Sequence, residues 1–206
     1  MKKLLLLAAA VTVLLLSFTK QDTMNTQRSL SSYDTILCVG DSLTNGYGAP
    51  EGESYPDHLK RLTGMHIIKS GINGETSSEG LQRLPDLLQK HHPKLTILCY
   101  GGNDILQKHS ISQLKQNLKK MISLCRAEGS DVLLISVPDI TLFGLEPLSL
   151  YEELSEETGT PLLSGTLSAI LEDPTLKSDQ IHPNAKGYRK IAEDLYEKIK
   201  KRYTLP

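Results

Sequence analysis

Short apolar runs alternate along this chain with longer segments in which apolar residues recur at helical spacing. The runs lie at 35–39, 66–69, 95–100 and 131–137, and a fifth, shorter one lies at 161–163. Turn residues bound each long run, and polar and apolar positions do not alternate strictly within it. This pattern is typical of strands that are buried on both faces of a sheet.

The segments between the runs predict helices, because their apolar residues fall three or four positions apart. The predicted helices span 55–63, 77–91, 111–128, 147–158 and 184–202. The inward face of the third helix is predicted to hold Ile111, Leu114, Leu118, Met121, Ile122 and Cys125. Strands alternating with helices predict an α/β fold: a single three-layer, flavodoxin-like domain whose mostly parallel five-stranded sheet carries helices on both faces.

The first residues depart from the pattern of the rest of the chain. Residues 1–20 begin with a basic segment and continue with an apolar run over 4–16. This run has the length of a signal-peptide core and is shorter than the roughly 20 residues of a membrane-spanning helix. We therefore expect a cleaved signal peptide, with an uncleaved signal anchor as the alternative; either would export the domain, to the periplasm or the medium. The polar segment 21–33 predicts a linker, which leaves 34–206 as the folded domain.

Composition narrows the function classes. A length of 206 residues suits one α/β domain with a substantial core. The formal net charge of −1 gives no reason to expect nucleic-acid binding. With no Trp and two Phe, an aromatic platform for single strands or sugars is not expected either. The odd cysteine count without regular spacing predicts that Cys38, Cys99 and Cys125 are small buried side chains rather than a disulfide framework.

The sequence GDSLTNG at 40–46 follows the first predicted strand directly. A serine hydroxyl at such a strand-to-helix turn projects from the edge of the sheet, and it becomes a nucleophile when a neighbouring base takes its proton. Ser42 is therefore a candidate nucleophile. The alternative is that Ser42 only caps the following helix. The motif differs from the G-x-S-x-G turn of α/β-hydrolases.

Two further loops follow strands, SGINGETS at 70–77 and YGGND at 100–104. Glycine-rich turns before helices offer backbone N–H groups to negative charge. Asn103 can present a side-chain amide N–H to an oxyanion, and one such donor contributes about 3–4 kcal/mol to transition-state stabilisation. The alternative is that both loops are simple turns, with Asp104 capping the next helix.

The sequence DQIHP at 179–183 lies just before the last predicted helix. A carboxylate three residues before an imidazole can accept the Nδ1–H bond and leave Nε2 free to act on a serine. A histidine in a surface loop is the alternative. Because Ser42 lies upstream at a strand end, Asp179 and His182 instead complete the side chains that a nucleophilic hydrolase needs.

These four segments resemble, in order, the conserved blocks of the SGNH hydrolase superfamily, also called GDSL esterases and lipases, over residues 34–203. The run GETS at 74–77 followed by GLQRLP at 80–85 is most similar to the bacterial multifunctional thioesterase/arylesterase/lysophospholipase subgroup. The resemblance implies an active site without a metal or cofactor. Its roles are Ser42 as nucleophile, His182 as general base, Asp179 as orienting partner, and an oxyanion hole made of the Ser42 and Gly74 N–H groups and the Asn103 amide.

The resemblance also implies a serine esterase that acts through an acyl-enzyme on acyl, aryl or lysophospholipid esters or on thioesters. The substrate is then a small-molecule or lipid ester, and association with a membrane surface is left open, as is the oligomeric state. One alternative is a carbohydrate or peptidoglycan O-acetylesterase of the same superfamily, and another is a catalytically silent binding module. Apolar residues between 139 and 165 either line an acyl pocket or pack a helix: Ile140, Leu142, Phe143, Leu145, Leu148 and Leu150.

Overall fold

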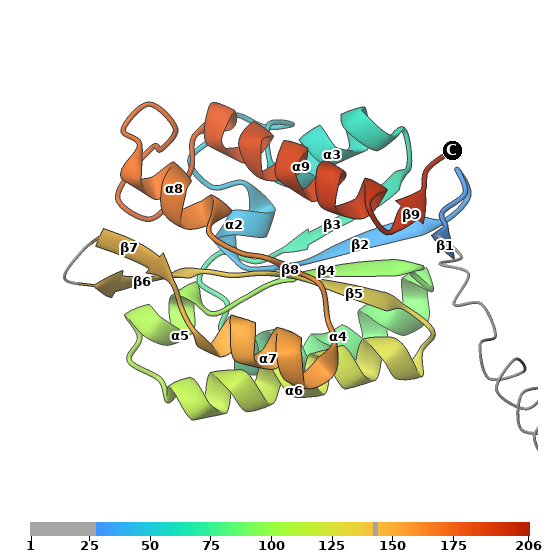
Figure 1. The fold of residues 1–206 in the computed structure, drawn as a ribbon, viewed down its shortest axis with the longest axis horizontal. Coiled ribbons are helices and arrows are strands. Elements are labelled where there is room, and N and C mark those ends of the chain that lie inside the picture. The colour runs from blue at the N-terminus through green and yellow to red at the C-terminus, as the bar shows by residue number, and fades with distance from the viewer. Residues whose placement is uncertain (1–27, 142–143) are drawn as a thin grey trace, which may run out of the picture.

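The computed structural model describes residues 28–141 and 144–206. These residues form three layers, a central sheet with helices on both faces (Figure 1). The predicted signal segment 1–20 lies outside the described residues, as do residues 21–27 of the predicted linker. Within the described part of the chain, no helix has the length and apolar character needed to cross a membrane.

The central sheet has five parallel strands in the order β3-β2-β4-β5-β8, which confirms the predicted fold class. The strands are β2 (Thr35–Gly40), β3 (His66–Gly71), β4 (Leu95–Cys99), β5 (Asp131–Ile135) and β8 (Leu162–Leu163). In register, Gly40 pairs with Gly71 on one side and with Cys99 on the other. The loops that follow β2, β3 and β4 therefore leave the sheet side by side at its carboxyl edge.

The helices are divided between the two faces of the sheet (Figure 1). One face carries α2 (Ser42–Asn45), α3 (Tyr55–Thr63), α8 (Thr166–Glu172) and α9 (Ala185–Lys200). The other carries α4 (Ser77–His91), α5 (Gly102–Leu106), α6 (Ile111–Ala127) and α7 (Leu150–Thr158). All five predicted helices are present, whereas the short helices α2, α5 and α8 were not predicted.

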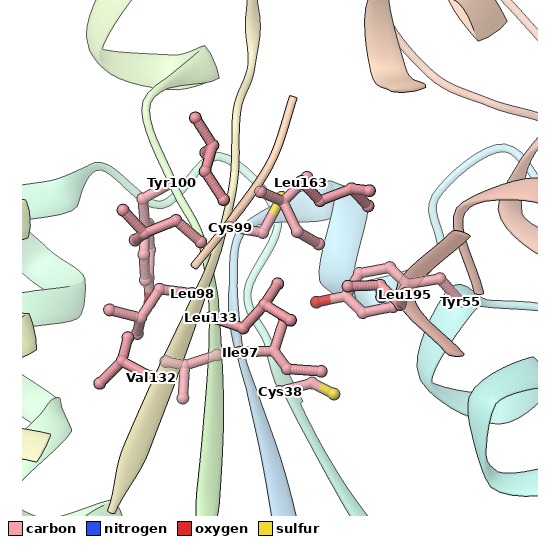
Figure 2. Close-up of a cluster of buried hydrophobic side chains, with 14 of the residues drawn as sticks. Cys38, Tyr55, Ile97, Leu98, Cys99, Tyr100, Val132, Leu133, Leu163 and Leu195 are labelled. Carbon is pink, nitrogen blue, oxygen red and sulfur yellow. The ribbon is translucent and has the colours of Figure 1, made fainter. Parts of the chain in front are cut away.

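The core lies on both sides of the sheet because successive strand residues point to opposite faces. Figure 2 shows Ile97 on the side of Tyr55 and Leu195, and Leu98 beside Tyr100 on the other. These five side chains are at most 1% exposed. All three cysteines are buried and free, as the sequence predicts.

Two features differ from what the sequence pattern alone indicates. Ile111 is 42% exposed, because it is the first residue of α6 and extends beyond the packed part of that helix. The folded domain begins before residue 34: β1 (Arg28–Ser29) pairs in parallel with β9 (Tyr203–Thr204), and Leu30 is buried. The guanidinium of Arg28 and the hydroxyl of Tyr203 both bind the carboxylate of Asp131 at the start of β5, which fixes this strand pair to the sheet.

The segment between β5 and α7 forms a two-stranded antiparallel hairpin, β6 (Pro138–Thr141) and β7 (Gly144–Pro147). The predicted helix at 147–158 begins three residues later than expected, at Leu150. The hairpin lies at the same end of the molecule as α2 and α5 (Figure 1). It therefore flanks the carboxyl edge of the sheet, where the candidate catalytic residues lie.

Candidate active site

Ser42 is the first residue of α2, directly beyond the end of β2. The helix cap is Asp41, whose Oδ1 accepts a 2.9 Å hydrogen bond from the Leu43 N–H. The alternative in which Ser42 serves as the cap is therefore wrong, and its hydroxyl is available for another contact. At Gly40 a Cβ atom would lie 2.4 Å from the Cys99 carbonyl oxygen, so only glycine fits at this turn.

His182 lies in the loop between α8 and α9, and the fold brings it to Ser42 across 140 residues of sequence. The distance from Ser42 Oγ to His182 Nε2 is 3.0 Å. On the other side of the ring, His182 Nδ1 lies 2.8 Å from Asp179 Oδ2. Because the carboxylate can only accept, Nδ1 carries the proton and Nε2 is left to accept the Ser42 hydroxyl proton.

Asp179 is held rigidly by its own loop. Its Oδ1 accepts the backbone N–H groups of Ile181 and His182, each at 2.8 Å. Partial burial acts to raise the pKa of Asp179, but the hydrogen bonds from Ile181 and from the His182 ring and backbone outweigh it and lower the pKa below the usual value. This carboxyl group is therefore ionised at neutral pH and can orient the imidazole.

Asn103 lies in α5, with its amide directed between two acceptors. Its Nδ2 is 3.0 Å from the Glu75 carbonyl oxygen and 3.3 Å from Asp41 Oδ2. It lines the same pocket as Ser42 and His182. Asp104, predicted to cap the next helix, instead accepts the Ser77 N–H at the start of α4 (2.9 Å).

Gly74 occupies the exposed loop between β3 and α4, with a φ of +80° that favours glycine. This loop contacts the helix that carries Ser42, since Asn45 Nδ2 donates to Asn73 Oδ1 at 2.9 Å. Of the predicted site residues, Ser42, Asn103 and His182 line the pocket, whereas Gly74 and Asp179 lie outside its lining. Asp179 is behind the imidazole, and Gly74 directly precedes Glu75, whose carbonyl holds Asn103.

Asp41, directly before Ser42, is a buried carboxyl group that the sequence analysis did not single out. Burial raises its pKa to about 7, and the nearby carboxylates of Asp104 and Glu75 act in the same direction, against the hydrogen bond from the Leu43 N–H. The residue next to Ser42 therefore changes charge near neutral pH.

The pocket in front of Ser42 has a volume of about 120 Å³. Its walls are mostly apolar, and its lining includes Leu43, Ile105, Leu106, Val137, Pro138, Leu145, Leu167, Leu171 and Ile181. The apolar residues between 139 and 165 were expected either to line a pocket or to pack a helix. Leu145 lines the pocket, whereas Leu150 packs in the core. Leu142 and Phe143 lie outside the described residues. The sequence pointed to Asn103 but not to the apolar lining from α5 (Ile105 and Leu106) or α8 (Leu167 and Leu171), because neither short helix has enough turns to show a periodicity.

The sequence profile of the GDSL-like Lipase/Acylhydrolase family matches residues 38–190, a span that begins in β2 and ends in α9. The chain belongs to this family. The GDSL-like assignment agrees with the resemblance stated for the four sequence blocks, and the matched span includes every predicted site residue.

Relatives of this GDSL-like enzyme include a thioesterase and esterases. The chain is 32% identical over 167 residues to thioesterase 1/protease 1/lysophospholipase L1 of Escherichia coli K12, covering 78% of this chain and 80% of the relative. It is 30% identical over 178 residues to an arylesterase of Vibrio mimicus, covering 82% and 89%. The chain is thus an enzyme of the carboxylic ester or thioester hydrolase type.

Solved structures of GDSL-like esterases share the fold. A crystal structure of TesA superposes with a TM-score of 0.75 at 28% identity, covering 82% of this chain and 99% of that one. The SGNH-hydrolase family esterase AlinE4 superposes with a TM-score of 0.64 at 31% identity, covering 84% and 98%. The similarity therefore extends over nearly the whole length of these neighbours.

Proposed function

We propose that this enzyme hydrolyses acyl or aryl esters and thioesters through Ser42, His182 and Asp179. The observation that carries the proposal is the unbroken chain of contacts from Asp179 Oδ2 to His182 Nδ1 (2.8 Å) and from His182 Nε2 to Ser42 Oγ (3.0 Å). Such a relay lets the imidazole take the hydroxyl proton as the oxygen attacks a carbonyl carbon.

In the first step Ser42 Oγ bonds to the carbonyl carbon and its proton passes to His182 Nε2. The negative charge moves to the carbonyl oxygen, where the N–H groups of Ser42 and Gly74 and the amide of Asn103 would stabilise it. The N–H of Asn103 that now faces Asp41 is the one free to turn to the oxyanion, because its bond of 3.3 Å is the longer of the two. The bond to the leaving group then breaks, and the leaving group takes the proton from His182.

The second step returns the enzyme to its starting state. A water molecule gives a proton to His182 Nε2 and attacks the acyl carbon. Collapse of the second tetrahedral intermediate releases the acid and returns the proton to Ser42 Oγ. The ionised Asp179 stabilises the imidazolium in both steps, so no external oxidant, reductant or metal enters the balance.

The apolar walls of the pocket favour acyl and aryl esters over the acetyl groups of a carbohydrate or peptidoglycan. Most of the residues that line the pocket are aliphatic, and each methylene that is buried in such a wall contributes about 0.8 kcal/mol to binding. An acetyl group buries only one methyl group there. Lipid and aryl esters, including lysophospholipids, therefore gain most from this site.

The experiment that tests the proposal is hydrolysis of p-nitrophenyl esters from acetate to palmitate by protein lacking residues 1–20. Ser42→Ala should abolish turnover and labelling by a fluorophosphonate, while Ser112→Ala, which removes an exposed serine on α6, serves as the matched control and should retain both. Full activity of Ser42→Ala would overturn the mechanism. Activity of the native chain confined to acetate would instead favour the O-acetylesterase alternative.

We also propose that the domain acts outside the cytoplasm. The support is the basic start and the apolar run of residues 1–20. Mass spectrometry of the protein recovered from the periplasm or medium of an expressing bacterium tests this: a mature chain that lacks the apolar run supports cleavage, a membrane-bound full-length chain supports an anchor, and a cytoplasmic full-length chain overturns export.

A further inference from the structure

Glu75 carries a nearly buried carboxylate that three donors satisfy. Glu75 as a whole residue is 6% exposed. Arg83 binds it with two parallel bonds, from Nε to Oε1 at 2.6 Å and from Nη2 to Oε2 at 2.6 Å. Tyr100 Oη donates to Oε2 at 2.6 Å. We call these three residues, Glu75, Arg83 and Tyr100, the Glu75 clamp.

The clamp is fixed to the carboxyl edge of the sheet. Arg83 Nη1 donates to Ser70 Oγ at 2.6 Å, and its Nη2 donates to the carbonyl oxygens of Ser70 at 3.0 Å and Gly40 at 3.3 Å. Ser70 is the last residue but one of β3, Gly40 is the last residue of β2, and Tyr100 directly follows β4. The carboxylate of Glu75 is therefore tied to the ends of three adjacent strands.

The fold leaves room for the clamp at one specific position. A Cβ atom at Gly80 would lie 2.3 Å from the Tyr100 ring, so the absence of a side chain on α4 is what lets this ring reach Glu75. Burial and the hydrogen bond to Glu75 raise the pKa of Tyr100, so that its hydroxyl stays protonated and continues to donate.

The backbone of Glu75 is linked to both candidate oxyanion donors that precede α4 or lie in α5. It follows Gly74 directly in the chain, and it is hydrogen-bonded to Asn103. Its carbonyl oxygen accepts from Asn103 Nδ2 at 3.0 Å, and its N–H donates to the Ile72 carbonyl at 3.2 Å. Its N-terminal neighbour is Gly74, which is exposed, has a positive φ, and would have open space around a Cβ atom. Gly74 lies inside the turn that the bond from the Glu75 N–H to the Ile72 carbonyl closes. The orientation of its N–H therefore depends on Glu75 at one end of the turn and, at the other, on Asn73, which Asn45 holds.

We propose that the Glu75 clamp positions the oxyanion hole, because it fixes the residue that closes the turn around Gly74 and accepts the Asn103 amide. Arg83 and Tyr100 act here as positioning residues and do not touch the substrate. The inference rests on the proposed function of Ser42, Gly74 and Asn103. It also accounts for a buried ion pair at this place, because such a pair is weak evidence for stability and is better explained by the geometry that it enforces.

The test compares kcat and KM of Arg83→Lys and Tyr100→Phe with those of the native enzyme on one p-nitrophenyl ester. Lysine keeps the charge but loses the two parallel bonds, and phenylalanine keeps the ring. We expect kcat to fall roughly 10-fold or more with KM within about two-fold, because the oxyanion forms only in the transition state. Arg126→Lys is the matched control: Arg126, in the last turn of α6, donates to the carbonyl of Thr158 at the end of α7, and the kcat of this variant should not change.

A double-mutant cycle with Asn103→Ala separates positioning from general support of the fold. If the clamp acts through Asn103, Arg83→Lys should cost much less kcat when the Asn103 amide is already absent, and melting temperatures should not follow kcat. Equal losses in both backgrounds, or an unchanged kcat in both clamp variants, would overturn the inference. If Ser42→Ala is inactive while Arg83→Lys has the kcat of the native enzyme, the clamp is rejected and the proposed function stands. If Ser42→Ala is active, the proposed function itself is rejected.

Discussion

The ring of Tyr47 lies against the imidazole of His182, with 4.6 Å between the ring centroids and an angle of 48° between the planes. Tyr47 follows α2, and its carbonyl oxygen accepts a 2.7 Å hydrogen bond from the buried Tyr188 on α9. The next residue, Gly48, packs so closely on Ser178 that a Cβ would lie 2.1 Å from its Oγ. The loops that carry Tyr47 and His182 are thus held together, and the aromatic ring restricts the imidazole on its outer side.

We expect Tyr47→Ala to lower kcat by roughly two- to ten-fold, because an aromatic contact of this kind contributes about 0.5–1.5 kcal/mol. Tyr47→Phe should retain activity, since the contact involves the ring and the backbone carbonyl rather than the hydroxyl. Steady-state kinetics of the two variants checks this. Equal losses in both would show that the hydroxyl, not the ring packing, matters.

Asp179→Asn should lower kcat by roughly 10²–10⁴-fold while the protein remains folded. The amide oxygen can still accept the N–H groups of Ile181 and His182, but the amide nitrogen would donate to Nδ1 and move the ring proton to Nε2. The imidazole then cannot accept the proton of Ser42. A loss of steady-state turnover with an unchanged circular dichroism spectrum would support this, and near-native turnover would contradict it.

Asp41 should make the enzyme less stable as pH rises from about 4 to 7. The pKa of Asp41 is about 7 in the folded protein against 3.8 for an unfolded aspartate. Between these two values the folded state holds a proton that the unfolded state has released, so the free energy of unfolding falls as pH rises, until both states are ionised above pH 7. The effect is roughly 4 kcal/mol at most. Urea unfolding at several pH values should give a falling free energy for the native chain and a flatter dependence for Asp41→Asn; parallel slopes would contradict the shifted pKa.

Leu145→Phe should narrow the pocket and shift substrate preference toward short acyl chains. Leu145 extends from β7 into the pocket lining, and its N–H is held by the carboxylate of Glu172 at 2.9 Å. We expect the ratio of octanoate to acetate hydrolysis to fall roughly 10-fold, as one or two methylenes lose their contact. Leu62→Phe, on the exposed side of α3, is the control that should leave the ratio unchanged. An unchanged ratio in Leu145→Phe would place the acyl chain elsewhere.

The long elements and the meeting of Ser42 with His182 follow from local signals. Five apolar runs with intervening helical periodicity predict the sheet, and parallel strands necessarily bring the residues after their carboxyl ends to one edge. The family resemblance then supplies the roles. The capping role of Asp41 was missed because both Asp41 and Ser42 suit a helix start by type, and only the backbone path decides between them.

The remaining features depend on contacts between distant segments. The Glu75 clamp needs Tyr100 to reach across Gly80, and no periodicity in either segment encodes that approach. Helix α8 contributes Leu167 and Leu171 to the pocket but is too short to show an amphipathic pattern. The pairing of β1 with β9 joins two-residue strands from opposite ends of the chain, which single-sequence patterns do not reveal.

That pairing has a practical consequence for handling the enzyme. Strand β1 is bound at the start of β5, at the amino ends of the strands, whereas Ser42 lies beyond their carboxyl ends. The described chain thus begins on the side of the molecule away from the pocket (Figure 1). A resin, sensor chip or fusion partner joined at this end would leave the mouth of the pocket turned toward the bulk solution, so that immobilised enzyme should turn over substrate as the free enzyme does.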